Sequence, residues 1–181
     1  MVDDSKGDSK ELVLDFFLSW TLRCACPVIG DNYSPSVTKY SREILAILLR
    51  VDSELLGNIS EIKVWKQSQK IDLWIEVYTD RDNFAMVIED KAYSSTHNDQ
   101  LNRYKDIFEA YYSEKSDAAF QRHYIVVVLG DKIPKKIIAD CKQSGYIPFS
   151  FETIYSQLKE RTTIELTKCD LFDEFWFGTW W

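Results

Sequence analysis

Two neighbouring segments in the middle of the chain predict a pair of adjacent β-strands. Apolar and polar residues alternate over residues 71–78, which is typical of a strand with one buried face. After a polar break at residues 81–83, the run at residues 84–88 is apolar throughout, as in a strand that is buried on both faces. Because a hairpin is the shortest connection between them, we expect two paired strands at the centre of the fold.

Three charged residues on these strands suggest a reactive site. Asp72 lies on the polar face of the first strand, and the second strand ends in Glu89, Asp90 and Lys91. Since side chains alternate along a strand, Glu89 and Lys91 share one face and Asp90 points to the other. The hairpin brings Asp72 within reach of Glu89. Two carboxylates there could hold a divalent metal, and the lysine could offset the negative charge that develops during phosphodiester hydrolysis.

The segment that follows has the period of an amphipathic helix. Its apolar and aromatic residues recur at intervals of three and four: Leu101, Tyr104, Ile107, Phe108, Tyr111 and Tyr112. Thr96 or Asn98 could cap this helix. Gln100 and Tyr104 are four residues apart and therefore lie on one face, in the turns that begin beside the Glu-x-Lys strand.

At these residues the chain resembles the PD-(D/E)xK nuclease superfamily, and more narrowly its bacterial and phage subfamily with Asp, Ile-Glu-x-Lys and Gln-Leu-x-x-Tyr motifs. The matching positions are Asp72, residues 87–91, Gln100, Leu101 and Tyr104. The resemblance implies an α/β (α+β) restriction-endonuclease-like core of element order α-βββ-α-β. It also implies a central mixed sheet of four to five strands flanked by helices, and a metal-dependent nuclease that hydrolyses DNA.

The resemblance further implies a set of metal ligands. Asp72 and Glu89 would bind Mg²⁺ or Mn²⁺ together with the backbone carbonyl of Asp90. An acidic residue on the helix before the first strand often completes such sites. Residues 41–45 offer Glu43 for this role.

The remaining motif residues would act on the substrate or on the site itself. Lys91 would activate or position the attacking water and stabilise the transition state, from an expected position at the exposed end of its strand. Gln100 and Tyr104 would orient the metal site or the nucleic-acid strand.

Each motif alone also has an ordinary structural interpretation. A Glu-x-Lys pair is common on solvated strands, and a lone Asp can protect a sheet edge from aggregation. Gln100 and Tyr104 could be a helix surface and a core aromatic. An alternative function is therefore a catalytically inactive member of the same fold that acts as an interaction or assembly module.

The rest of the chain supplies the scaffold of one domain spanning residues 1–181. The chain has 181 residues, 45% of them hydrophobic, which is enough for one core. Patterning predicts helices at 11–23 and 41–49 within an N-terminal helical region 9–50, with a loop at 26–36 and a helix cap at Thr38 or Ser41. It also predicts strands at 61–65, 123–129 and 146–151, and helices at 134–143 and 153–160.

Charge and composition limit the partners and the location. A net charge of −7 argues against a tight passive nucleic-acid binder, although a local basic patch could form around the site from Lys63, Lys66, Lys70, Arg103 and Lys105. No run of eighteen apolar residues predicts a membrane span, so we expect a cytoplasmic protein. The four cysteines lack a paired zinc-ligand spacing and are expected to be reduced thiols.

An aromatic tail at residues 171–181 is the last unusual feature. It contains Phe172, Phe175, Trp176, Phe177, Trp180 and Trp181. Because aromatic side chains bury large areas, we expect the tail to dock on its own domain; the alternative is a homodimer or protein-partner interface. Base stacking is less favoured because Asp170, Asp173 and Glu174 would repel phosphates.

Overall fold

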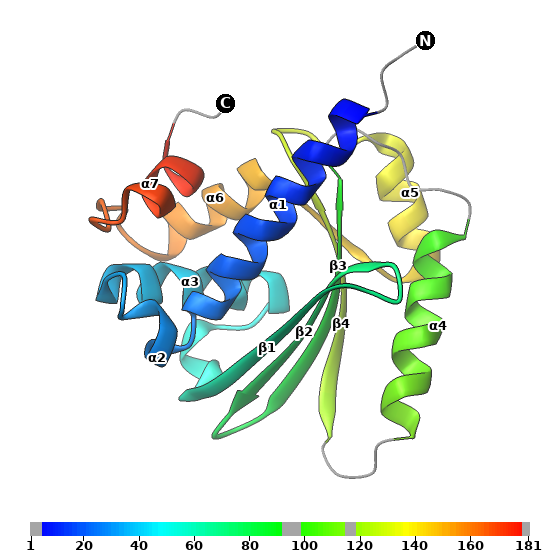
Figure 1. The fold of residues 1–181 in the computed structure, drawn as a ribbon, viewed down its shortest axis with the longest axis horizontal. Helices are drawn as coiled ribbons and strands as arrows, with labels where there is room; N and C mark the ends of the chain where they lie inside the picture. The colour runs from blue at the N-terminus through cyan, green and yellow to red at the C-terminus, as the bar shows by residue number, and fades with distance from the viewer. Residues whose placement is uncertain (1–4, 92–98, 115–118, 179–181) are drawn as a thin grey trace.

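A five-stranded mixed sheet forms the centre of the protein (Figure 1). A computed structural model describes residues 5–91, 99–114 and 119–178, with side chains from residue 11 onward. The strands follow in spatial order as β1 (Ile59–Ser68), β2 (Ile71–Thr79), β3 (Asn83–Lys91), β4 (Phe120–Val128) and β5 (Ile147–Ser150). The first three strands are antiparallel to one another, whereas β3, β4 and β5 run parallel.

Helices cover both faces of the sheet. They are α1 (Ser5–Cys24), α2 (Pro27–Gly30), α3 (Pro35–Leu49), the short 3₁₀ helix η1 (Ser53–Leu56), α4 (Gln100–Ser113), α5 (Lys135–Ser144), α6 (Phe151–Arg161) and α7 (Asp170–Trp176). Figure 1 shows α1 crossing one face and α4 lying against the other. The element order α-βββ-α-β and the restriction-endonuclease-like fold expected from the sequence are both confirmed.

The alternating residues of β2 divide the interior into two cores. Leu73, Ile75 and Val77 pack in the core beneath α1, α3 and α6, whereas Trp74 packs in a second core beneath α4 and α5. β3 is buried on both faces, as its continuous apolar run predicts. The sheet therefore holds its middle strands rigidly between two layers of helices.

Local capping chemistry explains where the observed helices differ from the expected ones. α3 begins at Pro35, earlier than expected, because the Ser34 side chain accepts a hydrogen bond from the Val37 backbone N–H at 3.2 Å and proline suits a first helical turn. The expected loop at 26–36 accordingly contains α2 and the start of α3. α4 begins after Asp99, which has a positive φ of 64°. The caps proposed at Thr96 and Asn98 lie outside the described residues.

The aromatic tail docks on its own domain, as expected. The side chains of Phe172, Phe175 and Trp176 are buried. Phe175 stacks on Phe17 of α1 with ring centroids 4.1 Å apart, and Trp176 donates a hydrogen bond to Thr21 of the same helix at 2.9 Å. These side chains are therefore not available to a second protein. Trp180 and Trp181 lie outside the described residues.

Candidate active site

The β2–β3 pairing brings the predicted carboxylates together. The register pairs Leu73 with Ile88. Continued by one residue, it places Asp72 opposite Glu89. The two strands meet here near the start of β2 and the end of β3. Asp72 is partly exposed, whereas Glu89 and Lys91 are buried. The site thus lies at the end of the hairpin, with Asp72 on its solvent side.

Two side chains fix one oxygen of Glu89. The Lys91 ammonium lies 2.5 Å from Glu89 Oε1, and the Gln100 amide donates to the same oxygen at 2.7 Å. Gln100 also donates to the Tyr104 hydroxyl at 2.9 Å. The first turns of α4 therefore reach the end of β3. The other oxygen of Glu89, Oε2, is buried without a hydrogen-bond partner among the described residues.

Asp90 points to the opposite face, toward α1, where it meets an acidic residue that sequence analysis missed. Carboxylate oxygens of Asp15, Asp72 and Asp90 all lie within 4.8 Å of one another. Asp72 Oδ2 also accepts a hydrogen bond from the Asp90 backbone N–H at 3.2 Å. Asp15 and Asp90 are only 4% and 1% exposed. Within the described ranges, Asp15 Oδ1 and both oxygens of Asp90 have no hydrogen-bond partner.

Burial and mutual repulsion raise the pKa values of Asp15, Glu89 and Asp90, so that their ionised forms are disfavoured. Burial, followed by the charge of Asp72, raises the pKa of Glu89 to about 8, and the ion pair with Lys91 offsets only part of this shift. The same two causes raise the pKa of Asp15 to about 6. Burial, followed by Asp15 and Asp72, raises the pKa of Asp90 further still, to about 11. A cation that bound these oxygens would reverse all three shifts.

The position of Lys91 corrects the expectation of an exposed strand end. Its side chain is only 7% exposed. Burial acts to lower the pKa of Lys91, but the adjacent Glu89, with Asp72 and Glu11, outweighs it and the net pKa is raised. The ammonium group therefore stays charged across the neutral range.

A family comparison agrees with this arrangement. A family model described as the PD-(D/E)XK nuclease superfamily matches residues 6–171. The chain belongs to the PD-(D/E)XK nuclease superfamily. It matches no curated protein and no solved structure with significance.

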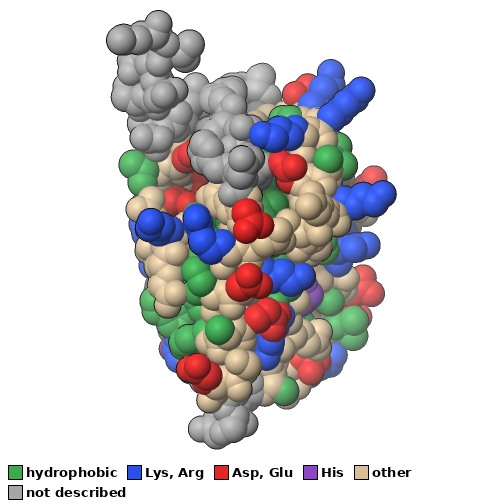
Figure 2. All heavy atoms as spheres, turned by 90° about the vertical axis from the view of Figure 1, so that its right-hand side faces the viewer, with side chains coloured by type: hydrophobic (Ala, Val, Ile, Leu, Met, Phe, Trp, Pro, Cys, Tyr) green, Lys and Arg blue, Asp and Glu red, His purple; other side chains and the backbone are tan. Residues whose placement is uncertain are grey.

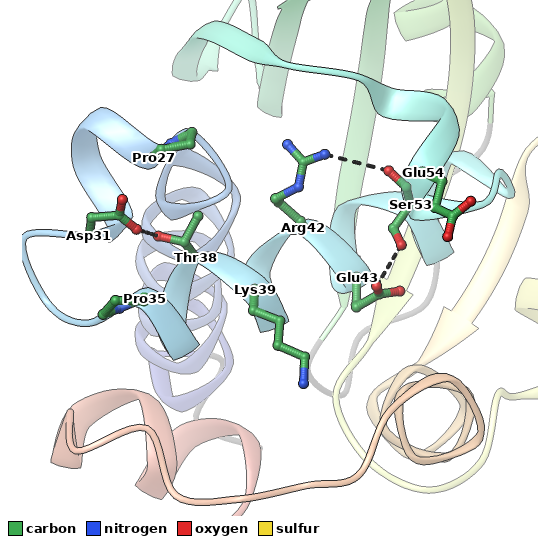
Figure 3. A pocket seen from close by; sticks show the side chains of 9 residues that line it. All are labelled: Pro27, Asp31, Pro35, Thr38, Lys39, Arg42, Glu43, Ser53 and Glu54. Carbon is green, nitrogen blue, oxygen red and sulfur yellow. Dashed lines mark hydrogen bonds between the residues drawn. The ribbon is translucent and has the colours of Figure 1, made fainter.

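In this PD-(D/E)XK protein, the acid that a preceding helix brings to Asp72 is Asp15, in place of the expected Glu43. Glu43 lies on α3 beside a surface pocket of about 390 Å³ (Figure 3). Its carboxylate accepts a hydrogen bond from Ser53 at 2.5 Å and lies 3.7 Å from Arg161. Asp15 reaches Asp72 and Glu43 does not because of how their helices pack. α1 lies across β1, β2 and β3, whereas α3 packs mainly on α1 and α6. The sequence offered one indication of Asp15: it is a carboxylate within an apolar stretch of α1 that also contains Leu14 and Leu18.

Two of the five residues expected to form a basic patch interact with neighbouring groups. Lys63 pairs with Glu61 at 3.4 Å, and Lys105 donates to the backbone carbonyl of Ser144 at 3.3 Å. On the side of the molecule that carries α4, acidic and basic side chains are interspersed (Figure 2). Lys66 differs from the others, because its charge acts on Asp15 and lowers the pKa of that carboxyl. In the part of the chain that the structure describes, no helix is both long and apolar enough to cross a membrane.

Proposed function

We propose that this PD-(D/E)XK protein is a Mg²⁺- or Mn²⁺-dependent nuclease that hydrolyses DNA phosphodiester bonds at Asp72, Glu89 and Lys91. The observation that carries the proposal is the carboxylate of Glu89. One of its oxygens is held by Lys91 and Gln100, and the other is buried beside Asp72 with no hydrogen-bond partner in the described part of the chain. That arrangement orients a carboxylate for a ligand that the protein itself does not supply.

The residues present fit a hard divalent cation. Such ions take oxygen ligands, which the carboxylates of Asp72 and Glu89 and the backbone carbonyl of Asp90 provide. A buried polar atom without a partner costs about 1–3 kcal/mol, and a cation would satisfy Glu89 Oε2. When bound, the cation supplies Lewis-acid polarisation of the phosphate and lowers the pKa of a coordinated water.

The neighbouring side chains have separate roles in this proposal. Lys91 positions the attacking water and stabilises the negative charge that develops on the phosphate, because its ammonium group stays charged. Gln100 holds the Glu89 carboxylate in one orientation, and Tyr104 supports the Gln100 amide. The N-terminal amides of α4 also favour an anionic phosphate near Gln100.

The rival proposal, an inactive interaction module that binds through the aromatic tail, receives less support. The side chains that would form the interface at Phe172, Phe175 and Trp176 are buried against the same chain.

Cleavage assays test the proposed function directly. Linear, circular and branched DNA, with an RNA of matched sequence, would be incubated with the protein in Mg²⁺, Mn²⁺ or EDTA. We expect DNA cleavage only with metal, and a loss of about a hundredfold or more in Asp72→Asn and Glu89→Gln. Glu76→Gln is the matched control, because Glu76 is a buried carboxylate on the same strand and face as Asp72. Equal cleavage by Glu89→Gln and wild type, or no cleavage by wild type in any metal, would refute the proposal.

A further inference from the structure

We propose that Trp65 of β1 is a stacking surface for an unpaired base next to the scissile phosphate, and that this protein therefore prefers single-stranded DNA to duplex DNA. This inference rests on the proposed function and extends it to the form of the substrate. Trp65 binds the DNA strand in this proposal and takes no part in the chemistry.

The register of the sheet places Trp65 on the same face as Glu89. Trp65 lies directly across from Trp74 of β2, and the Trp74 ring packs on Phe108 of α4 at 4.9 Å between centroids. Directly opposed residues of antiparallel strands share a face, so Trp65 also points to the α4 side. On β3, Glu89 meets Gln100 of α4 on that side. Two strand spacings, about 10 Å in total, separate β1 from β3, so the nucleotides next to a phosphate bound at Glu89 would reach Trp65.

The ring of Trp65 is open to a ligand. The side chain is 39% exposed, on a strand that forms one edge of the sheet. The other tryptophans with described side chains each pack on aromatic rings: Trp20, Trp74 and Trp176. The ring of Trp65 contacts no aromatic ring among the described residues. α4 packs mainly on β3 and α5, which leaves the Trp65 ring uncovered.

The surroundings of Trp65 favour nucleic acid over protein as the ligand. Lys63 lies two residues away on the same face, with its side chain 41% exposed, although Glu61 offsets part of its charge at 3.4 Å. Lys66 and Lys70 are exposed and follow toward the turn between β1 and β2. The core of a protein interface is depleted of lysine, whereas sites for single-stranded nucleic acid combine basic side chains with aromatic rings.

Stacking also suits the acidic charge of the whole chain. A net charge of −7 limits the affinity that phosphate contacts can supply. A base that stacks on an aromatic ring adds affinity that does not depend on neutralising phosphates. In a duplex the bases are paired and stacked inside the helix, so only an unpaired base can lie on Trp65. The preference for single-stranded DNA follows from this requirement.

Fluorescence anisotropy of labelled DNA in EDTA measures binding by the full-length protein without cleavage. The probes are a short single strand and the duplex of the same sequence, and we expect wild type to bind the single strand more tightly. Trp65→Ala should weaken single-strand binding by about tenfold or more, the loss expected for one stacked base, and leave duplex binding unchanged. Trp65→Phe should restore most of the affinity. Tyr33→Ala is the matched control, because Tyr33 is an aromatic residue that is 48% exposed between α2 and α3.

An abasic strand of the same length separates stacking from a structural effect, because it keeps the phosphates and lacks the bases. Trp65→Ala should weaken binding of the normal strand and leave binding of the abasic strand unchanged. An equal loss on both strands would show that Trp65 supports the fold or the phosphate contacts, and would overturn the inference. Circular dichroism of each variant establishes that the fold is retained.

The outcomes separate this inference from the proposed function, because binding in EDTA does not require a metal. If Trp65→Ala and wild type bind the single strand equally, or wild type does not bind it, the inference is overturned, and cleavage by wild type in Mg²⁺ still decides the proposed function. If wild type binds the single strand through Trp65 but cleaves nothing in any metal, the stacking surface stands and the proposed function fails. A wild-type dimer in analytical ultracentrifugation that Trp65→Ala converts to a monomer, with DNA binding unchanged, would assign the ring to a second copy of the chain.

Discussion

The buried acidic residues of the site lower the free energy of unfolding of the protein. Asp15, Asp72, Glu89 and Asp90 converge from one helix and two strands, and three of them have raised pKa values because burial and neighbouring charges disfavour ionisation. A core built only for stability would place apolar side chains at these positions. Under the proposed function, a bound cation would restore the free energy that the buried acids cost.

The raised pKa values predict how metal and pH act together. Folded Asp15 titrates near 6 and Glu89 near 8, above their ordinary values of 3.8 and 4.5, so the folded state binds more protons than the unfolded state. In EDTA, the free energy of unfolding should therefore fall as the pH rises from about 4 to about 8. Mn²⁺ should raise the melting temperature more at the upper end of this range than at the lower end.

Thermal unfolding across this pH range, with Mn²⁺ or EDTA, measures both effects. Asp90→Asn provides the internal comparison, since it removes one of the raised pKa values. In EDTA it should gain stability relative to wild type as the pH rises above the ordinary aspartate pKa of 3.8. A difference between variant and wild type that does not change with pH would contradict the assignment of these shifts to the buried acids.

Lys91→Ala should impair both activity and stability. Sequence alone suggested an exposed lysine, but the side chain is buried and paired with Glu89. Breaking a buried pair costs about 3–5 kcal/mol when the remaining charge cannot be neutralised. Because the pKa of Glu89 is raised to about 8, this carboxyl is protonated at lower pH, so the loss of stability should be small up to about pH 7 and grow as the pH rises past 8. DNA cleavage should fall by about a hundredfold or more.

Chemical denaturation at several pH values, with cleavage measured where the variant is folded, checks this prediction. Lys63→Ala is the matched control, because Lys63 forms an exposed pair with Glu61 and should change stability by no more than about 0.5 kcal/mol. Full cleavage by Lys91→Ala would remove Lys91 from the catalytic assignment.

At the scale of elements, α4 is fixed to the sheet at both of its ends. Its first turn reaches Glu89 through Gln100. Near its last turn, the Tyr112 hydroxyl donates to Glu76 of β2 at 2.7 Å and accepts a hydrogen bond from Trp74 at 3.0 Å. Buried polar networks of this kind position an element with little freedom to slide.

Tyr112→Phe should therefore destabilise the protein without touching the site. The change removes a donor to the buried Glu76 carboxylate, which costs about 1–3 kcal/mol. Tyr33→Phe is the control, because Tyr33 is 48% exposed and its change should stay within about 0.5 kcal/mol. Urea unfolding measures the free energy of unfolding of both variants. Equal stability of Tyr112→Phe and wild type would show that the network does not hold α4.

Elements with strong periodicity were predictable from sequence, whereas the partner of Asp72 was not. The alternation of β2, the apolar run of β3 and the apolar stripe of α4 each reflect burial that the chain encodes locally. Gln100 and Tyr104 could be placed beside Glu89 for the same reason. The choice between Asp15 and Glu43 depends on which helix crosses the sheet, and that is decided by packing between residues far apart in the chain. The burial of Lys91 likewise depends on contacts that no local pattern reveals.

At the scale of the whole molecule, α7 closes the core over α1. Phe175 contacts Phe17 and Phe151, and Trp176 stacks on Phe151 and bonds to Thr21. α1 carries Asp15, so the segment that was predicted to dock on the domain also supports a helix of the site.

Phe175→Ala should cost about 3–5 kcal/mol, the range for deleting a buried aromatic ring. Leu171→Ala on the same helix is the control, because Leu171 is 47% exposed and its loss should change stability by about 0.5 kcal/mol at most. Denaturant unfolding compares the two. A small effect of Phe175→Ala would mean that α7 is not part of the cooperative core.

The contact between α1 and α7 also has a consequence for synthesis on the ribosome. Thr21 and Trp176 are 155 positions apart, so the support of α1 cannot form until translation has passed Trp176. By the time that Lys91 has been added, the four acidic residues of the site have all been made, but the helix that brings Asp15 to the others lacks its packing partner. A nascent chain therefore carries every acid of the cluster long before it can hold them in place.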